Sequence, residues 1–305
     1  MATLAQQLLA SKSDLPTQLT SAQLRELGAD ILRQSLFSAR MSNATAVQAL
    51  RESINRILAS VDGQSADNLA DARLKLKQIG ALLDYDPKTG FPGEQAEAAE
   101  AGSLRDIFST DRLNLILKTQ EMMTQGAAKN IWGNEPDQLE EYPAWELVRV
   151  NSVETPRGEK RVKGGVQEVP EDAWDTANGR WQAAAEESGD ENAGDIFEQT
   201  GRMVARKDSP IWESLGNGAG GYDDTLGNDY EPFAFNSGMG RVELSAKEFE
   251  ELGGDASGLA ASDTDFGSGE VKVNQSRFDP DILKTLKAGL ESGDLKFRVK
   301  VQVVK

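Results

Sequence analysis

The sequence predicts an α+β protein, with an N-terminal helical module followed by a mixed, loop-rich α+β domain. Apolar residues recur at helical spacing through roughly the first 85 positions. Two later segments, 145–150 and 295–304, alternate in the way that β-strands do. The 305 residues are 38% hydrophobic, which suits a packed core. We expect a helical module at 1–87, a linker at 88–102, a mixed α+β domain at 103–252, and a flexible loop, helix and terminal strand at 253–305.

Three amphipathic helices are expected in the first module. The first covers 21–37, with Ser21 available as its N-cap. The second follows Thr45, and the third starts near Ser65. Each helix has an apolar stripe that it cannot bury alone, so the three should pack as a small bundle. The stripes are Leu24, Leu27, Ile31 and Leu32; Val47, Leu50, Ile54, Ile57 and Leu58; and Leu69, Ala72, Leu76, Ile79 and Leu83.

The middle of the chain changes from helical to strand-like patterns. Residues 88–102 are rich in glycine, alanine and glutamate, which is typical of a linker or an exposed crossing. Ser109 or Thr110 can cap a long helix that continues to about Trp132. The segment 145–150 then suits a strand, and the charged residues 154–161 indicate a hairpin tip or an exposed loop.

The second half begins with an acidic, alanine-rich region at 169–194. Trp174 and Trp181 are seven residues apart, so on a helix both would pack on one face. Residues 186–194 should form a solvated loop. Ser245 and Glu248 have the capping-box spacing of a short helix within 242–252. The remaining predictions are a loop at 253–269, a helix at 278–289 and a strand at 295–304 with a basic polar face.

A loop-rich core is expected at 201–239, because this stretch holds a large share of the chain's few aromatic rings. Trp145, Trp212, Phe233 and Phe235 are the predicted core anchors. The stretch also contains a local basic group. A helix over 202–207 would place Arg202 and Arg206 on one face.

Arg202, Arg206 and Lys207 form the candidate contact for a partner. They either pair with internal carboxylates, which is the commoner case, or reach a partner surface, and the sequence does not separate the two.

Two absences restrict the chemistry that this chain can perform. It has no Cys and no His, so disulfides, thiolate or imidazole metal sites and His-dependent nucleophile pairs are excluded. Carboxylate chemistry stays open. Asp223, Asp224, Asn228, Asp229 and Glu231 crowd one loop, but without the spacing of a known calcium motif. The glycines of 216–221 lack the Lys-Ser/Thr that a phosphate loop requires. We assign no catalytic residue, no metal site and no cofactor.

The charge is strongly acidic, with a net value of −17. An acidic body repels nucleic-acid phosphates, although the basic C-terminal strand leaves a weak DNA contact open. No apolar run is long enough to span a membrane, and the N-terminus lacks an export signal. We expect a soluble, non-exported protein with no membrane partner.

Several stretches together resemble the Mu F-like minor head, or head morphogenesis, proteins of tailed bacteriophages. The resemblance covers residues 30 to 252, most of the chain, and depends on the combination of motifs. The acidic region 168–195 and the loop 214–228 are longer than the family's pattern. The stretches are Phe37–Ala44, Asp111–Thr119, Tyr142–Arg149, and the pair Gly201–Trp212 and Pro232–Met239.

The resemblance implies a virion component that acts in head assembly by binding portal or inner capsid subunits, and not a catalyst. Such a protein would be assembled in the bacterial host cytoplasm. Two other hypotheses stay open. One is a virion protein released with the DNA, and the other is a carboxylate-based polysaccharide or cell-wall hydrolase.

Overall fold

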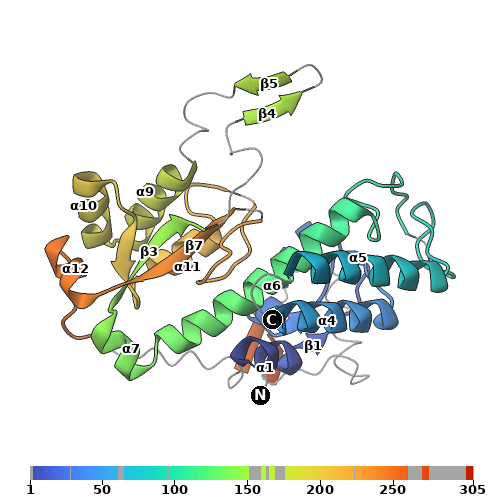
Figure 1. Cartoon of the computed structure of the whole chain (residues 1–305), viewed down its shortest axis with the longest axis horizontal. Coiled ribbons are helices and arrows are strands. Elements are labelled where there is room, and N and C mark those ends of the chain that lie inside the picture. The colour runs from blue at the N-terminus through green and yellow to red at the C-terminus, as the bar shows by residue number, and fades with distance from the viewer. Residues whose placement is uncertain are drawn as a thin grey trace. The chain divides into compact units, whose positions relative to one another are not determined.

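The computed structural model describes residues 3–27, 29–60, 65–94, 96–150, 159–162, 165–168, 176–222, 224–235, 237–259, 270–274 and 300–304. Helices dominate and are accompanied by small sheets, which confirms the α+β class (Figure 1). The chain divides into two compact units. Unit 1 comprises Met1–Gln125 and Asp265–Lys305, and unit 2 comprises Gly126–Thr264. The division lies within helix α6 (Thr110–Gly133), not at the expected linker 88–102.

Unit 1 is built mainly of helices. α4 and α5 lie side by side (Figure 1), and β1 pairs with β2, as β8 does with β9, in parallel. Its elements besides the first part of α6 are α1 (Leu4–Ser11), β1 (Ser13–Asp14), α2 (Ser21–Glu26), α3 (Ala29–Arg33), β2 (Ser35–Leu36), α4 (Ala44–Leu58), α5 (Ser65–Leu82), β8 (Glu270–Asn274) and β9 (Lys300–Val304).

The second and third predicted helices are confirmed as α4 and α5. All five predicted apolar residues of α4 are buried, and those of α5 are buried or packed against the same core. The cap of α4 differs from the prediction. Asn43 Oδ1 accepts the N–H groups of Thr45 and Ala46 at 2.9 and 3.2 Å, so Asn43 is the N-cap.

The first predicted helix is wrong in extent. It is split into α2, which ends at Glu26, and α3, which begins at Ala29. The chain then enters β2 before residue 37. Thr20, and not Ser21, caps the N-terminus of α2. Its Oγ1 accepts the N–H of Gln23 at 3.3 Å, and its own N–H donates to Gln23 Oε1 at 2.9 Å.

The segment 88–102 is part of the core of unit 1, and its prediction as a linker is wrong. Phe91 is only 4% exposed. Its ring packs edge-on against Tyr85 and Phe108, with ring centroids 5.3 and 6.1 Å apart. Three aromatic rings thus anchor this segment, because edge-to-face contacts add to the area that the rings bury. Because the residues around Phe91 are mostly small or acidic, the composition of the segment did not indicate this role.

Unit 2 is organised around a three-stranded antiparallel sheet in the order β6–β3–β7, and Figure 1 shows β3 and β7 side by side. A separate antiparallel pair is formed by β4 and β5. The elements besides the end of α6 are α7 (Pro136–Glu141), β3 (Ala144–Arg149), β4 (Glu159–Val162), β5 (Gly165–Glu168), α9 (Thr176–Ser188), α10 (Glu191–Thr200), β6 (Val204–Arg206), α11 (Ile211–Asn217), β7 (Met239–Leu244) and α12 (Ala246–Glu251).

Several predictions for unit 2 hold. β3 occupies the predicted strand, and α6 begins at Thr110, where Ser109 Oγ accepts the N–H of Arg112 at 3.2 Å. The Ser245–Glu248 capping box starts α12, although β7 takes the residues before it. At the C-terminus of the chain, in unit 1, residues 300–304 form the described part of the predicted terminal strand.

Other predictions for unit 2 are wrong. The expected loop 186–194 shrinks to Gly189 and Asp190, because Asp190 Oδ1 accepts the N–H of Ala193 at 2.9 Å and starts α10 directly. The expected hairpin tip at 154–161 is in part β4, which begins at Glu159. Trp174 and the helix predicted at 278–289 lie outside the described residues.

Candidate functional site

The main concentration of buried charge in unit 2 surrounds Trp145, a fully buried residue of the central strand β3. Three cations lie over its ring. Lys207 Nζ is 4.3 Å from the ring centroid, Arg241 Cζ 4.9 Å and Lys129 Nζ 5.1 Å. Such cation–π contacts are strongest where water is excluded. We call Trp145, Lys129, Asn130, Lys207, Glu231, Arg241 and Glu243 the Trp145 cluster.

The strand register explains why these groups meet. Trp145 is paired with Ala205 of β6 on one side and with Glu243 of β7 on the other. Lys207 follows β6 directly, and Arg241 lies in β7 two residues before Glu243. The sheet therefore brings charges from distant parts of the sequence around one indole ring.

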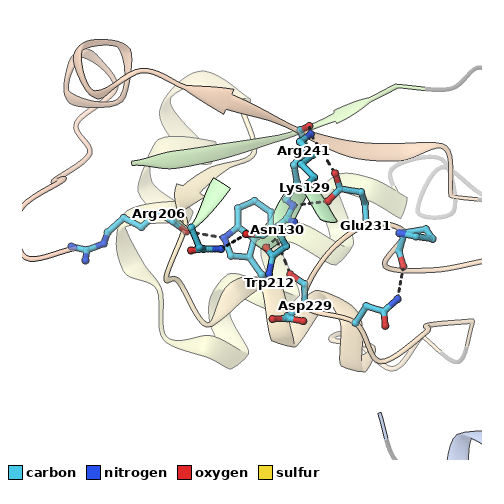
Figure 2. A network of polar contacts seen from close by, with 10 residues as sticks. Lys129, Asn130, Arg206, Trp212, Asp229, Glu231 and Arg241 are labelled. Carbon is cyan, nitrogen blue, oxygen red and sulfur yellow. Dashed lines mark hydrogen bonds and ion pairs between the residues drawn. The ribbon is translucent and has the colours of Figure 1, made fainter. Parts of the chain in front are cut away.

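Carboxylates and carbonyls satisfy the cations of the cluster. Arg241 Nε donates to Glu231 Oε2 at 2.7 Å, and its Nη2 donates to Asn130 Oδ1 at 3.0 Å (Figure 2). Lys129 Nζ lies 3.3 Å from Glu231 Oε1 and also donates to the carbonyl of Arg241. Glu231 is thus held between two cations.

Lys207 forms the other half of the cluster. Its side chain is fully buried, and its Nζ donates to Glu243 Oε1 and to the Gly133 carbonyl, each at 2.8 Å. Burial lowers the pKa of Lys207 below its ordinary value, although the neighbouring Glu243 opposes this shift.

The pKa of Glu231 results from a different balance of effects, which keeps its carboxylate ionised. Burial alone would raise its pKa, but the charges of Arg241 and Lys129 outweigh burial and hold that pKa below its ordinary value. The side chains of Arg241 and Glu231 are only 1% and 12% exposed. Breaking so buried a pair from one side would leave a charge without compensation.

Helix α6 approaches this cluster closely because two of its residues are glycines. A Cβ at Gly126 would lie 1.8 Å from the Glu231 carbonyl oxygen, and one at Gly133 would lie 2.4 Å from the Trp145 ring. The two glycines are seven residues apart and therefore share one face of the helix, together with Lys129 and Asn130. This polar, small-residue face is the signal in the sequence that could have revealed the cluster.

Three of the four predicted core anchors are buried. Trp145, Trp212 and Phe233 are 0%, 2% and 5% exposed. Trp212 stacks on Phe233 with centroids 6.1 Å apart, and its Nε1 donates to the Arg206 carbonyl at 2.7 Å (Figure 2). Phe235 is 36% exposed, so its prediction as a core anchor is wrong.

The predicted basic patch does not exist as one surface. The segment expected to be a helix is the strand β6, in which neighbouring side chains point to opposite faces. Lys207, just beyond this strand, is buried in the Trp145 cluster, so it is not an exposed contact. Figure 2 shows the Arg206 side chain pointing away from Trp212.

The two arginines of the predicted patch pair with internal carboxylates, which is the commoner of the two alternatives that the sequence left open. Arg202 Nε and Nη2 donate to the two carboxylate oxygens of Glu146 at 2.8 and 2.6 Å. Arg206 makes the same fork with Asp208 at 2.8 and 2.7 Å, and it also donates to the Ser257 carbonyl at 2.9 Å. The Arg202–Glu146 pair and the Arg206–Ser257 contact bind separate parts of unit 2 to each other, whereas the Arg206–Asp208 pair is local.

The acidic and glycine-rich loops are only partly described, and their described residues pair within the chain. Among the described residues, no group of three or more acidic side chains is placed to hold a metal ion. Asp224 accepts a hydrogen bond from Arg180 Nη2 at 2.6 Å, and Asp223 lies outside the described residues. A Cβ at Gly216 would lie 1.7 Å from the Asn228 carbonyl oxygen. The close approach of the Asn228 backbone therefore accounts for the glycine at this position of α11.

Comparison with known proteins adds nothing to this geometry. In the described part of the chain, no helix has both the length and the apolar content to cross a membrane. No protein-family model matches the chain, and no curated protein or solved structure matches it either.

Proposed function

We propose that the chain is a minor head protein of a tailed bacteriophage, located in the virion, that acts in head morphogenesis by binding portal subunits, major capsid subunits or both. The proposal starts from the resemblance of the stretches described above. The observation that carries it is where those stretches lie, since they come together as two groups of contacting residues and not as scattered similarities.

The first group lies in unit 1. Arg112, in the stretch Asp111–Thr119, directs Nη2 toward Ser38 Oγ and the Ala39 carbonyl of the stretch Phe37–Ala44, both at 3.4 Å. Met41 of one stretch and Leu113 of the other belong to the same buried apolar cluster. Residues that resemble the family pattern therefore contribute to the core of this unit.

The second group lies in unit 2. The stretch Tyr142–Arg149 provides the central strand, and Gly201–Trp212 provides the neighbouring strand β6 and the start of α11. The stretch Pro232–Met239 places Phe233 against Trp212. In both groups the resembling residues take part in the packing of one unit, which supports treating the resemblance as one coherent pattern.

The hydrolase alternative needs two carboxyl groups that face one substrate. In the described part of unit 2, Glu146, Glu231 and Glu243 each pair with a cation instead. No specific observation favours that alternative, or release of the chain with the DNA.

The test compares phage particles assembled with and without the gene for this chain, with the intact gene supplied in trans as the control. We expect particles that lack the chain to change in protein composition, DNA content or infectivity. Quantitative mass spectrometry should find on the order of a dozen copies or fewer for a portal-bound protein, and on the order of hundreds for one spread over the capsid lattice. Particles unchanged in all three properties would refute the proposal.

A further inference from the structure

A small pocket opens in unit 2 beside the sheet. It lies between the end of β3, α9, α11 and the segment that leads into β7, and its volume is about 50 Å³. A water molecule needs about 10–15 Å³ by this measure, so the space fits a short side chain better than a large ligand. The apolar part of its wall includes Leu147, Leu215, Phe233 and Met239.

Both charged residues in the wall of this pocket are arginines. Arg180, from α9, donates Nη2 to Asp224 Oδ1 at 2.6 Å and stacks on Tyr222, with Cζ 3.9 Å from the ring centroid. These contacts hold the guanidinium in a fixed plane. Its Nε is nevertheless buried and has no hydrogen-bond partner among the described residues. A buried donor without an acceptor is costly and needs an explanation.

The second arginine, Arg149, stands at the end of β3 and is exposed. Its contact is a long hydrogen bond from Nη1 to the Ser237 carbonyl, at 3.5 Å. No described carboxylate lies within 4.0 Å of its guanidinium nitrogens. Arg180 is balanced by Asp224, so within the described part of the chain the pocket carries one positive charge without a carboxylate partner, and the net charge of the chain is −17.

We propose that this pocket binds a short peptide segment of a partner protein, in which one apolar side chain enters the pocket and an adjacent carboxylate pairs with Arg149 and Arg180. The apolar wall and the small volume select a single aliphatic side chain. The one uncompensated charge selects one carboxylate, because the acidic surface as a whole repels a polyanion such as DNA. Guanidinium groups suit a carboxylate because they can donate two hydrogen bonds in one plane.

Such a segment would fit whether or not the chain is part of a virion, so the pocket can be tested separately from the proposed function. The probe is N-acetyl-leucine, titrated into the full chain and followed by the ¹⁵N–¹H resonance of Arg180 Nε. N-acetyl-leucinamide has the same side chain without the carboxylate, and inorganic phosphate has the charge without the side chain.

We expect N-acetyl-leucine to bind saturably with a Kd of a few millimolar, roughly what so small a ligand can reach. The amide and phosphate should bind at least about tenfold more weakly. Arg149→Ala should weaken binding about fivefold, which is the effect of one exposed ion pair. Ala177→Leu, which fills the pocket from the wall of α9, should abolish binding while both arginines stay in place.

The matched control is Arg56→Ala, which removes one exposed arginine from α4 in unit 1 and should leave the Kd unchanged. Equal binding of the acid and the amide would overturn the role of the arginines. Equal binding of phosphate would show an adventitious ion only. Binding that survives Ala177→Leu would place the ligand elsewhere and overturn the proposal.

Discussion

Replacement of Arg241 by Met should destabilise unit 2 by about 3 kcal/mol. The Arg241 side chain is 1% exposed and makes the 2.7 Å contact with Glu231 Oε2 and the 3.0 Å contact with Asn130 Oδ1. Removal of one partner of a buried ion pair costs about 3–5 kcal/mol. We expect the lower end of that range, because Lys129 Nζ remains 3.3 Å from the other oxygen of Glu231.

Arg202→Met is the matched control, because it makes the same change in a more exposed pair of the same unit. Arg202 and Glu146 form a two-pronged contact, but their side chains are 38% and 16% exposed. Such a pair contributes about 1 kcal/mol or less. The contrast of about 2 kcal/mol between the two variants tests burial, and not merely the presence of an ion pair.

The assay is urea unfolding followed by tryptophan emission. All five tryptophans fall within Gly126–Thr264, so their emission reports on unit 2 alone. With an m-value of about 1–3 kcal/mol per M, Arg241→Met should lower the midpoint by about 0.7–2 M relative to Arg202→Met. Equal midpoint shifts in the two variants would refute the reasoning.

Acid should remove the stability that the ion pair of Arg241 and Glu231 contributes to unit 2. Because the pKa of Glu231 is lower in the folded than in the unfolded chain, its ion pair stabilises unit 2 above the ordinary carboxyl pKa of 4.5. This stabilisation is lost as the pH falls through the lowered, folded-state pKa. The difference in stability between the native chain and Arg241→Met should therefore shrink in acid, and a constant difference would contradict the assignment.

Four further substitutions should have predictable effects. Gly216→Ala should destabilise unit 2 by more than about 3 kcal/mol, because its Cβ would lie 1.7 Å from the Asn228 carbonyl oxygen. Gly194→Ala in α10 should instead stabilise unit 2 by about 0.5–1 kcal/mol in the same urea assay. Burial lowers the pKa of Lys12 to about 8 in the folded chain. Between pH 8 and 10.5 only the unfolded chain keeps this proton, so the thermal stability should rise with pH. Lys12→Met should remove this rise, which amounts to at most about 3 kcal/mol. Ser245→Ala should cost about 1 kcal/mol and speed amide hydrogen exchange in the first turn of α12; unchanged exchange would argue against the capping box.

Helices α4 and α5 of unit 1 could be predicted because their signal is local. In α4 the apolar spacing alone identified the buried face, and every predicted residue is in the core. Phe91 was missed because its neighbours are small and acidic, while its partners Tyr85 and Phe108 depend on how the chain folds back. Composition identifies a segment's average environment and not the one residue that anchors it.

The Trp145 cluster was only half visible in the sequence. Trp145 was predicted as an anchor, but Arg241 and its partner Asn130 are 111 residues apart, and a charged residue is usually exposed. Lys207 was misplaced for a different reason. It follows Arg206 directly as part of a local basic group, which predicted a shared exposed patch, whereas in the structure it lies just beyond β6 and is buried.

The boundary within α6 limits where the chain can be divided into fragments. Thr110–Gln125 contributes 16 of the 24 residues of the helix, and the 8 that remain belong to unit 2. An isolated helix of that length is unstable in water. Yet Lys129 and Asn130, on that short piece, hold Glu231 and Arg241. In a fragment that begins at Gly126 this short helix would unfold, and Lys129 and Asn130 would no longer hold Glu231 and Arg241. A separable form of unit 2 must therefore begin at Thr110 or earlier.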